Sequence, residues 1–304
     1  AFQQLKVQRQ RYELAQAQLE RAQRFVTTGQ RAQIEINRAE AGLAQSLESI
    51  IIAENNLRNT QRELKRVIRK AGLETRGTTF ITPTTEPNPI HYTFDKDKLI
   101  AQAVDNRMEM LETELQIAKN ISNIDYLKNQ ALPVVSLDYT YNMNGLGPTR
   151  SDAYDLLQDN NFNDHRIGLN LMIPLGNMAA KSRLRAAYYS RMQLLASKEN
   201  RQLTIEVEVL NALDQLEANW LRVLAARQST ILNDRLYQAE IRQFENEMRT
   251  STDVLEAQTN FTDAQSTEIN AIAEYQIALV DLAYATGTLL GAAQVDWEPE
   301  PTSN

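Results

Sequence analysis

The chain has 304 residues and contains no cysteine. Disulfides, catalytic thiolates and zinc–thiolate sites are therefore excluded. Histidine is almost absent as well, since His91 and His165 are the only two and they stand alone in the sequence. No phosphate-binding glycine loop and no nucleophile motif occurs. We therefore expect no catalytic residue, no metal and no cofactor, and a function other than that of an enzyme.

Glycine and proline are scarce, with 10 and 8 residues, whereas Ala, Gln, Glu, Leu and Arg dominate. The 110 residues from Asn177 to Thr286 contain neither, which favours very long helices. No apolar run approaches the roughly 18 residues of a membrane-spanning helix, and the densest run is Ile50–Ile52. The opening residues Ala1–Gln4 lack the features of a signal peptide and resemble the interior of a helix. We therefore expect the natural N-terminus to lie further upstream.

The net charge of −7 is unevenly distributed, because the residues up to Arg76 include 14 basic and 8 acidic side chains. Arginine and glutamate are interspersed in this stretch, which is typical of a solvated helix face. We therefore expect no nucleic-acid partner.

Heptad spacing is the clearest pattern. Large apolar residues recur every seven positions, and each is followed three positions later by a second seam residue, as in the a and d positions of a coiled coil. The a positions are Ile36, Leu43, Ile50, Leu57 and Leu64, and the d positions are Ala39, Ser46, Ala53, Thr60 and Val67. An earlier run has Leu5, Tyr12, Leu19 and Val26. Thr28–Gly29 separates the two runs, so the sequence predicts a coiled-coil hairpin.

The same register recurs 218 residues later, which indicates an internal duplication. Its a positions are Val254, Phe261, Tyr275 and Leu282, and its d positions are Ala257, Ala264, Ala271, Ala278 and Ala285. A helix break is required near Met248–Ser251, and Thr250 with Asp253 supplies an N-cap pattern for the helix that follows. Small d residues bring helix axes close together, so we expect a thin-walled tube or rod.

Two segments of about nine residues alternate apolar and polar side chains, the length of a tilted strand that crosses a bilayer. The residues predicted to face the membrane are Val135, Leu137, Tyr139, Tyr141, Ile167, Leu169, Leu171 and Ile173. A polar connection, Asn144–Asp164, is typical of an external loop. The alternative is an ordinary surface hairpin packed on one face.

The sequence thus predicts a mainly α fold, with long antiparallel coiled-coil hairpins in two tandem repeats and a small β-hairpin. We divide it into a first-repeat hairpin (1–72), an irregular connection (73–94), a helix of the second repeat (95–132), strands with an external loop (133–175), the long helices and hairpin of the second repeat (176–291) and an extended tail (292–304).

The segment Arg249–Gln258, with its Asp-Val-Leu-acidic-Ala core, resembles the second hairpin tip of the TolC family of outer-membrane efflux proteins. Gly29–Ala39 resembles the first tip, while Gln130–Tyr141 and Arg166–Gly176 resemble the helix–strand junctions. Glu247 stands where the family has glycine. The resemblance covers essentially the whole chain, but the opening helix, two strands and most of one long helix of the first repeat are expected upstream.

The resemblance implies a homotrimer whose α-barrel crosses the periplasm below a twelve-stranded membrane β-barrel, with four strands from each subunit. Because it has two strands, this chain on its own is not expected to close that barrel, and we expect it to be soluble without a lipid bilayer. The implied function is a passive exit duct in the outer membrane for tripartite efflux or type I secretion. Its implied partners are a periplasmic adaptor protein, an inner-membrane transporter and outer-membrane lipid; whether the N-terminus carries a lipid anchor stays open.

The resemblance also places a periplasmic gate at the hairpin tips, formed by Glu35, Arg249, Asp253 and Glu256. It pairs Arg249 with Glu35, and the acids would form a ring that favours cations. Adaptor docking is expected at Gly29, Gln30, Arg31, Ala32, Met248 and Thr250. From the residues alone, two other interpretations of these charged residues stay open: ordinary surface charges and an acid–base pair. Two other functions also stay open: a soluble structural coiled coil and a periplasmic adaptor.

Overall fold

The computed structural model describes residues 1–70, 72–85, 87–160 and 162–295. The chain forms two compact units, one of Ala1–Ala103 with Glu206–Asn304 and one of Val104–Ile205. Helices dominate the described residues, which contain one two-stranded antiparallel sheet. The predicted fold class is therefore confirmed. No helix among these residues combines the length and the apolar composition needed to span a membrane.

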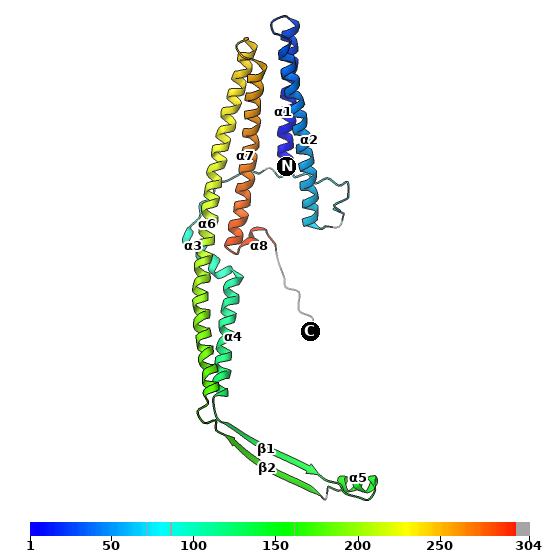
Figure 1. The fold of residues 1–304 in the computed structure, drawn as a ribbon, viewed down its shortest axis with the longest axis vertical. Coiled ribbons are helices and arrows are strands. Elements are labelled where there is room, and N and C mark those ends of the chain that lie inside the picture. The colour runs from blue at the N-terminus through cyan, green and yellow to red at the C-terminus, as the bar shows by residue number, and fades with distance from the viewer. Residues whose placement is uncertain (71, 86, 161, 296–304) are drawn as a thin grey trace. The chain divides into compact units, whose positions relative to one another are not determined.

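In the first unit, α1 (Phe2–Thr27) and α2 (Ile34–Ile68) form an antiparallel hairpin (Figure 1). The chain turns at Gly29, whose φ of 77° is a left-handed conformation that glycine adopts without strain. Leu5 of α1 packs with Leu57 of α2 in a small buried cluster. The predicted coiled-coil seam is therefore present between these two helices.

This seam is shorter than the heptad pattern predicts. Leu64 and Val67 are 41% and 67% exposed. Helix α1 covers the earlier part of α2, but these two residues lie beyond the point where α1 begins. At this level Lys65 is buried instead, and its Nζ donates a hydrogen bond to the carbonyl oxygen of Gly77 at 3.0 Å. The last turns of α2 are thus held by the connection that follows them.

The second hairpin consists of α6 (Met178–Glu245) and α7 (Ser251–Ala285) (Figure 1). The expected helix break is present, and it occupies residues 246–250. Tyr275 is 1% exposed and packs against Leu213 and Leu216 of α6. All five alanines at the d positions are buried: Ala257, Ala264, Ala271, Ala278 and Ala285. The predicted seam of this hairpin is therefore confirmed.

The connection from α2 to α3 (Lys96–Asn106) packs against the second hairpin. The hydroxyl of Tyr275 donates to the carbonyl oxygen of Ile90 at 2.5 Å. The ring of His91 lies 5.2 Å from that of Trp220. After α7, α8 (Leu289–Ala292) ends the described helices. Ala292 was predicted to begin the extended tail, so that boundary was wrong, and from residue 296 onward the tail lies outside the described residues.

In the second unit, the helix predicted from Asp95 through about Gln130 is interrupted. Arg107 has extended backbone angles (φ −75°, ψ 127°) and precedes α4 (Met108–Gln130). Its guanidinium lies 2.7 Å from the carboxylate of Glu109. Hydrogen bonds from Arg107 and from the backbone lower the pKa of Glu109 to about 2. The polar bonds made by an extended Arg107 compete with a continuous helix, so prediction of a single helix was wrong.

Strands β1 (Val134–Met143) and β2 (Asn163–Met172) pair in an antiparallel register that joins Val134 to Met172 and Met143 to Asn163. Ile173 lies outside the sheet, because β2 ends before Pro174, which has no amide hydrogen to donate. Its prediction as a strand residue was therefore wrong.

The external connection is not wholly irregular, since it contains α5 (Arg150–Gln158). The Thr149 side chain accepts a hydrogen bond from the amide of Asp152 and caps this helix. A Cβ atom on Gly145 would lie 2.1 Å from the carbonyl oxygen of Ala153, so only glycine permits this approach. The sequence carried this cap signal, but the polar composition suggested a loop.

Candidate functional site at the hairpin tips

The two hairpin turns are built alike, 218 residues apart. Glu247 has φ 64°, close to the 77° of Gly29 at the equivalent position. The amides of both residues donate to carbonyls three residues earlier, those of Val26 and Phe244. A left-handed conformation costs roughly 1–2 kcal/mol for a residue with a Cβ atom. The second turn is therefore strained where the first is not.

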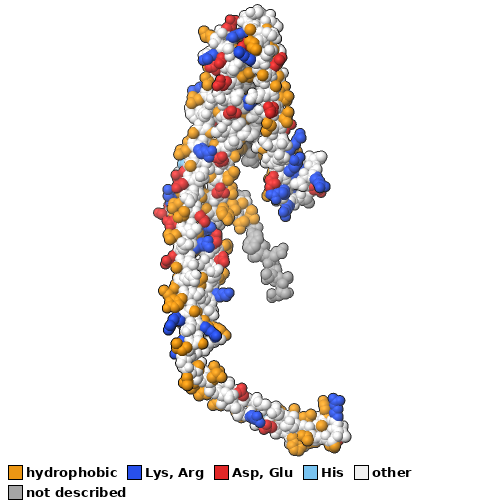
Figure 2. Space-filling model, in the orientation of Figure 1, with side chains coloured by type: hydrophobic (Ala, Val, Ile, Leu, Met, Phe, Trp, Pro, Cys, Tyr) orange, Lys and Arg blue, Asp and Glu red, His pale blue; other side chains and the backbone are white. Residues whose placement is uncertain are grey.

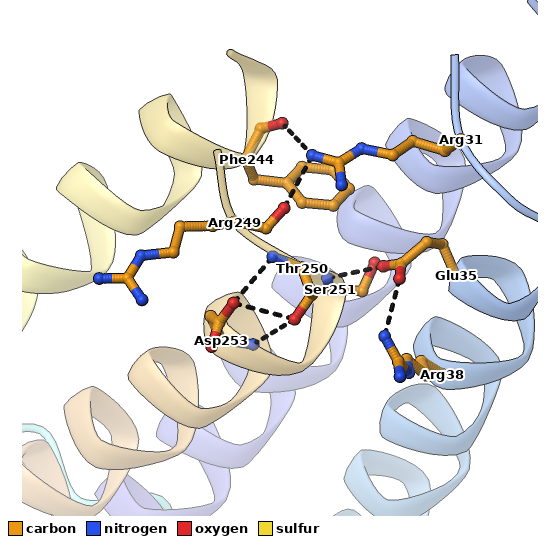
Figure 3. A network of polar contacts seen from close by, with 8 residues as sticks. All are labelled: Arg31, Glu35, Arg38, Phe244, Arg249, Thr250, Ser251 and Asp253. Carbon is orange, nitrogen blue, oxygen red and sulfur yellow. Dashed lines mark hydrogen bonds and ion pairs between the residues drawn. The ribbon is translucent and has the colours of Figure 1, made fainter. Parts of the chain in front are cut away.

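The start of α7 is closed by a reciprocal cap. The Thr250 hydroxyl accepts a hydrogen bond from the Asp253 amide, and the Asp253 carboxylate accepts from the Thr250 amide at 2.8 Å (Figure 3). The bonds from Thr250 lower the pKa of Asp253. The N-cap predicted from this spacing is therefore confirmed, and it turns Asp253 toward its own helix end.

Glu35 connects the first hairpin to this helix end. Its carboxylate accepts a hydrogen bond from the backbone amide of Ser251 at 2.7 Å and one from Arg38 at 2.8 Å (Figure 3). Glu35 is 5% exposed, and Ser251 is fully buried. Burial raises the pKa of Glu35, but the bond from Ser251 and the charges of Arg38 and Arg31 outweigh it, so the net pKa is lowered. The carboxylate stays charged and fixes Ser251.

Arg31, on the same hairpin as Glu35, contacts the residues on either side of this turn. It donates hydrogen bonds to the carbonyl oxygens of Phe244, at 3.2 Å, and Arg249, at 2.7 Å (Figure 3). Its guanidinium carbon lies 5.1 Å from the centre of the Phe244 ring. Phe244 is fully buried and meets Phe25 of the first hairpin edge-on at 5.7 Å. The predicted docking residue Arg31 is thus an internal contact between the two tips.

Arg249 does not pair with Glu35 in this chain. Its Nε donates to Gln243 at 3.0 Å and lies 3.3 Å from a carboxylate oxygen of Glu240, both on its own hairpin. Figure 3 shows the Arg249 guanidinium pointing away from Glu35. The expected contact between the hairpins exists, but Glu35 makes it through Ser251 and Arg249 contributes only its carbonyl.

Glu256 is exposed on α7 and lines a groove of about 430 Å³ between α2 and α7. Arg38 and Gly42 line the same groove from α2. A Cβ atom on Gly42 would lie 2.6 Å from Leu255 Cδ2, so glycine permits the two helices to approach closely here. The structure therefore places Asp253 and Glu256 near one another on α7, with Asp253 engaged and Glu256 free to face solvent.

The remaining residues predicted for docking are divided between two environments. Gly29, Gln30, Ala32 and Met248 are exposed. Thr250 is half-buried in the cap of α7. The turns thus present small and flexible side chains to solvent.

Below the tips, the two hairpins meet through polar contacts between α1 and α7. Gln258 Nε2 donates to the carbonyl oxygen of Arg11 at 2.7 Å, and Arg11 donates to Thr259 at 3.2 Å. Nearer the tips, Leu14 and Phe25 pack against the buried cluster of the second hairpin. The contact between the hairpins therefore combines apolar packing with the polar bonds of Glu35 and Arg31 near the turns, and it includes polar contacts further from them.

The strand pair has one apolar and one polar face. Its apolar cross-strand pairs are Val135–Leu171, Leu137–Leu169, Tyr139–Ile167 and Tyr141–His165. His165 stacks on Tyr141 at 4.8 Å, and its Nδ1 lies 2.7 Å from the hydroxyl of Tyr139. All these residues are exposed in the single chain. The structure thus places the predicted membrane-facing residues other than Ile173 on one face of the sheet, together with His165.

Sequence reasoning missed Arg38, Phe244 and Ser251. Arg38 follows Glu35 by one helical turn, a spacing that brings opposite charges together. Ser251 acts through its backbone amide, which leaves no signature in the sequence. Within the described residues, no cluster of three or more His, Cys, Asp or Glu side chains is suited to a metal ion.

The family described as outer membrane efflux protein matches residues 99–288, more than half of the chain. The chain belongs to this family. The resemblance noted from the hairpin tips is thereby confirmed, and membership places the chain among outer-membrane efflux proteins.

Curated relatives include outer membrane protein TolC of Vibrio cholerae, 26% identical over 281 residues, and TolC of Salmonella enteritidis, 24% identical over 282. Each alignment covers 90% of this chain, but 61% of the first relative and 55% of the second. The chain thus spans less than two thirds of their length.

Solved structures share the fold. The Campylobacter jejuni CmeC outer membrane channel superposes with a TM-score of 0.70 at 16% identity, covering 95% of this chain and 59% of that chain. The channel CusC superposes with a TM-score of 0.72 at 15% identity, covering 94% of this chain and 64% of that one. The outer-membrane protein VceC of Vibrio cholerae gives 0.68 at 14% identity, covering 94% of this chain and 66% of that one.

Proposed function

We propose that this chain is part of a subunit of a passive outer-membrane exit duct, which serves tripartite efflux or type I secretion and is gated at its hairpin tips. Family membership supports the class of protein. The observation that carries the gate is the contact of Glu35 with the Ser251 amide, since it joins the two hairpins of one chain at their turns. We propose that three subunits, each with its two hairpins joined in this way, close the duct at the tips.

The strand pair supports membrane insertion. An ordinary surface hairpin would cover one face with its own chain, yet almost every residue of β1 and β2 is exposed here. A two-stranded sheet is marginally stable until its edges pair. We therefore assign its apolar face to outer-membrane lipid and its edges to further strands of a closed barrel.

The helices support assembly with further copies. Ile51 and Ile52 of α2 are 61% and 55% exposed, and Ile277 and Val280 of α7 are 59% and 54% exposed. Apolar side chains in this number on helix faces are typical of surfaces that another subunit covers. We propose a homotrimer, the assembly implied by the family resemblance, in which these faces are buried.

At the gate, Glu256 and Asp253 of three subunits would line the closed end with carboxylates. Such a ring attracts cations and repels anions. We propose Arg249 as the residue that links this ring to the rest of the gate, with Glu35 holding the turn. The exposed Gly29, Gln30, Ala32 and Met248 would receive a periplasmic adaptor protein, which connects the duct to an inner-membrane transporter.

Charged side chains of both signs are interspersed along most of the face drawn in Figure 2, which does not favour a nucleic-acid partner. A soluble structural coiled coil and a periplasmic adaptor are both disfavoured, because the family match runs through the strand pair as well as the second hairpin.

The duct is tested with the full-length protein in planar bilayers. We expect trimers by chemical cross-linking and discrete, low-conductance, cation-preferring channels. Full-length protein that stays monomeric in detergent and forms no channels would contradict the proposal.

A further inference from the structure

The turn between α6 and α7 is held at both ends by the first hairpin. Arg31 bonds to the carbonyl of Phe244, in the last turn of α6, and to the carbonyl of Arg249, just before the cap of α7. We propose that Arg31 is a positioning residue of the gate, which sets the turn of the second hairpin and, through it, the direction of the Arg249 side chain. This inference rests on the proposed function.

Arginine suits this role better than lysine. Both bonds come from one terminal nitrogen, Nη2, which stands one bond further from the backbone than a lysine Nζ, and the planar guanidinium lies over the Phe244 ring. The carbonyl of Phe244 lies near the C-terminus of α6, where the helix dipole favours a cation. Phe244 is fully buried and its ring lies under the guanidinium. The Arg31 side chain is therefore anchored on a rigid surface.

Arg31 and Glu35 act on opposite groups of the same turn. The Arg31 guanidinium donates to two carbonyl oxygens, and the Glu35 carboxylate accepts from the amide of Ser251. With its carbonyl directed at Arg31, Arg249 projects its own guanidinium back to Gln243 and Glu240. Figure 3 shows the guanidinium groups of Arg31 and Arg249 on opposite sides of the turn. The orientation of Arg249 thus follows from a bond made by Arg31.

The internal duplication shows that the contact runs in one direction. Arg31 and Arg249 are 218 residues apart and occupy equivalent positions. Arg31 reaches across to the other hairpin, whereas Arg249 stays on its own. The first hairpin therefore positions the second, and the strained Glu247 lies inside the segment that is held.

The first test uses this chain, whose backbone amide exchange is measured by mass spectrometry over residues 244–252. Arg31→Met keeps an apolar side chain on Phe244 and removes the donors. We expect exchange in this segment to rise about tenfold or more, since two hydrogen bonds from a charged group are lost. Exchange in the middle of α6, over residues 205–226, should not change.

Two variants sharpen the test. Arg24→Met is the control, because it removes an exposed arginine of the same hairpin whose side chain donates to the Glu20 carbonyl within α1, and it should leave residues 244–252 as in the parent. Arg31→Lys keeps the charge, but its ammonium is one bond shorter and lacks the planar group over the Phe244 ring, so exchange should rise by an intermediate factor. If Arg31→Met loses its helical circular dichroism, Arg31→Lys carries the test.

Parent-like exchange in Arg31→Met or equal acceleration in Arg24→Met would overturn the two-carbonyl contact, and parent-like exchange in Arg31→Lys would overturn the preference for arginine. In full-length protein in planar bilayers, Arg31→Met should raise single-channel conductance. Faster exchange with unchanged conductance would overturn the link from Arg31 to the gate. Absence of channels from the full-length parent would instead refute the duct, whatever the exchange of this chain shows.

Discussion

The carboxylate of Glu35 accepts a hydrogen bond from the backbone amide of Ser251, 216 residues later in the chain and 2.7 Å away. Both residues are buried, so water cannot replace either partner. The bond gives α7 an acceptor for one of the free amides at its first turn, and this acceptor comes from another hairpin. A contact that stabilises a helix start also joins two hairpins.

Removing this acceptor should destabilise the chain. Glu35→Ala leaves the Ser251 amide buried without a partner, which costs about 1–3 kcal/mol. Glu35→Gln keeps an acceptor oxygen and should cost less. The measurement is the free energy of unfolding in urea, and the control is Glu48→Ala, an exposed glutamate on the same helix. Equal losses in Glu35→Ala and Glu48→Ala would show that the bond to Ser251 contributes nothing.

The tips should loosen in acid. The pKa values of Glu35 and Asp253 are both lowered in the folded chain, so each carboxylate stabilises the fold fully above its ordinary pKa. That stabilisation is lost as the pH falls below about 4.5 for Glu35 and about 3.8 for Asp253, toward the lower folded values. We expect faster amide exchange at residues 246–253 on going from pH 6 to pH 3, after correction for intrinsic rates. In Glu35→Gln the part of this change due to Glu35 should disappear; an identical pH profile in the variant would contradict the assignment.

The helices, the hairpins and the duplication were predictable because each leaves a periodic pattern. The five alanines from Ala257 to Ala285 repeat every seven residues, and all are buried. The cap of α7 was predictable because Thr250 and Asp253 interact over three residues. Local interactions of this kind can be recognised from residues that lie close together in the sequence.

The interactions that the sequence did not reveal are those between distant backbone groups. Glu35 bonds to an amide and Arg31 to two carbonyls, and every residue of the chain except proline offers both groups. An ion pair was expected between Arg249 and Glu35, but the Arg249 guanidinium contacts Gln243 and Glu240 of its own hairpin, and Glu35 contacts the Ser251 amide and Arg38. Periodicity also extended the first seam to Val67, where no partner helix remains.

The equivalent turn residues should respond oppositely to substitution. Glu247→Gly relieves a left-handed backbone and should stabilise the chain by about 0.5–1 kcal/mol, after the entropic cost of glycine is subtracted. Gly29→Ala introduces the same strain at φ 77° and should destabilise it by about 1 kcal/mol. Thermal unfolding of both variants beside the parent measures this. Destabilisation by Glu247→Gly would mean that its side chain makes a contact that outweighs the strain.

Two leucines of one heptad pattern should differ in their contribution. Leu57 is 7% exposed in the seam, and truncation of a buried leucine to alanine costs about 2–5 kcal/mol. Leu64 is 41% exposed, so Leu64→Ala should change the free energy of unfolding of this chain by less than about 0.5 kcal/mol. Urea titration of the two variants tests whether the seam ends where α1 ends. Comparable losses would extend it to the last turns of α2.

The carboxylates of α7 should set ion selectivity in the full-length duct. Glu256 is exposed on the groove, so Glu256→Gln removes three charges from a trimer without disturbing a packed contact. Cation preference, measured as the reversal potential in a salt gradient across a planar bilayer, should fall, and block by multivalent cations should weaken. Asp253→Asn should act in the same direction, with a further loss of stability of up to about 1 kcal/mol because the amide replaces a charged acceptor in the first turn of α7.

Glu199→Gln is the control for selectivity, since it removes an exposed charge from α6 in the other compact unit and should leave the reversal potential unchanged. If Glu256→Gln and Asp253→Asn both select as the parent does, these carboxylates do not line the narrowest part of the duct. The duct itself would survive that outcome, because its evidence is the family match and the fold. Its constriction would then lie elsewhere along the helices.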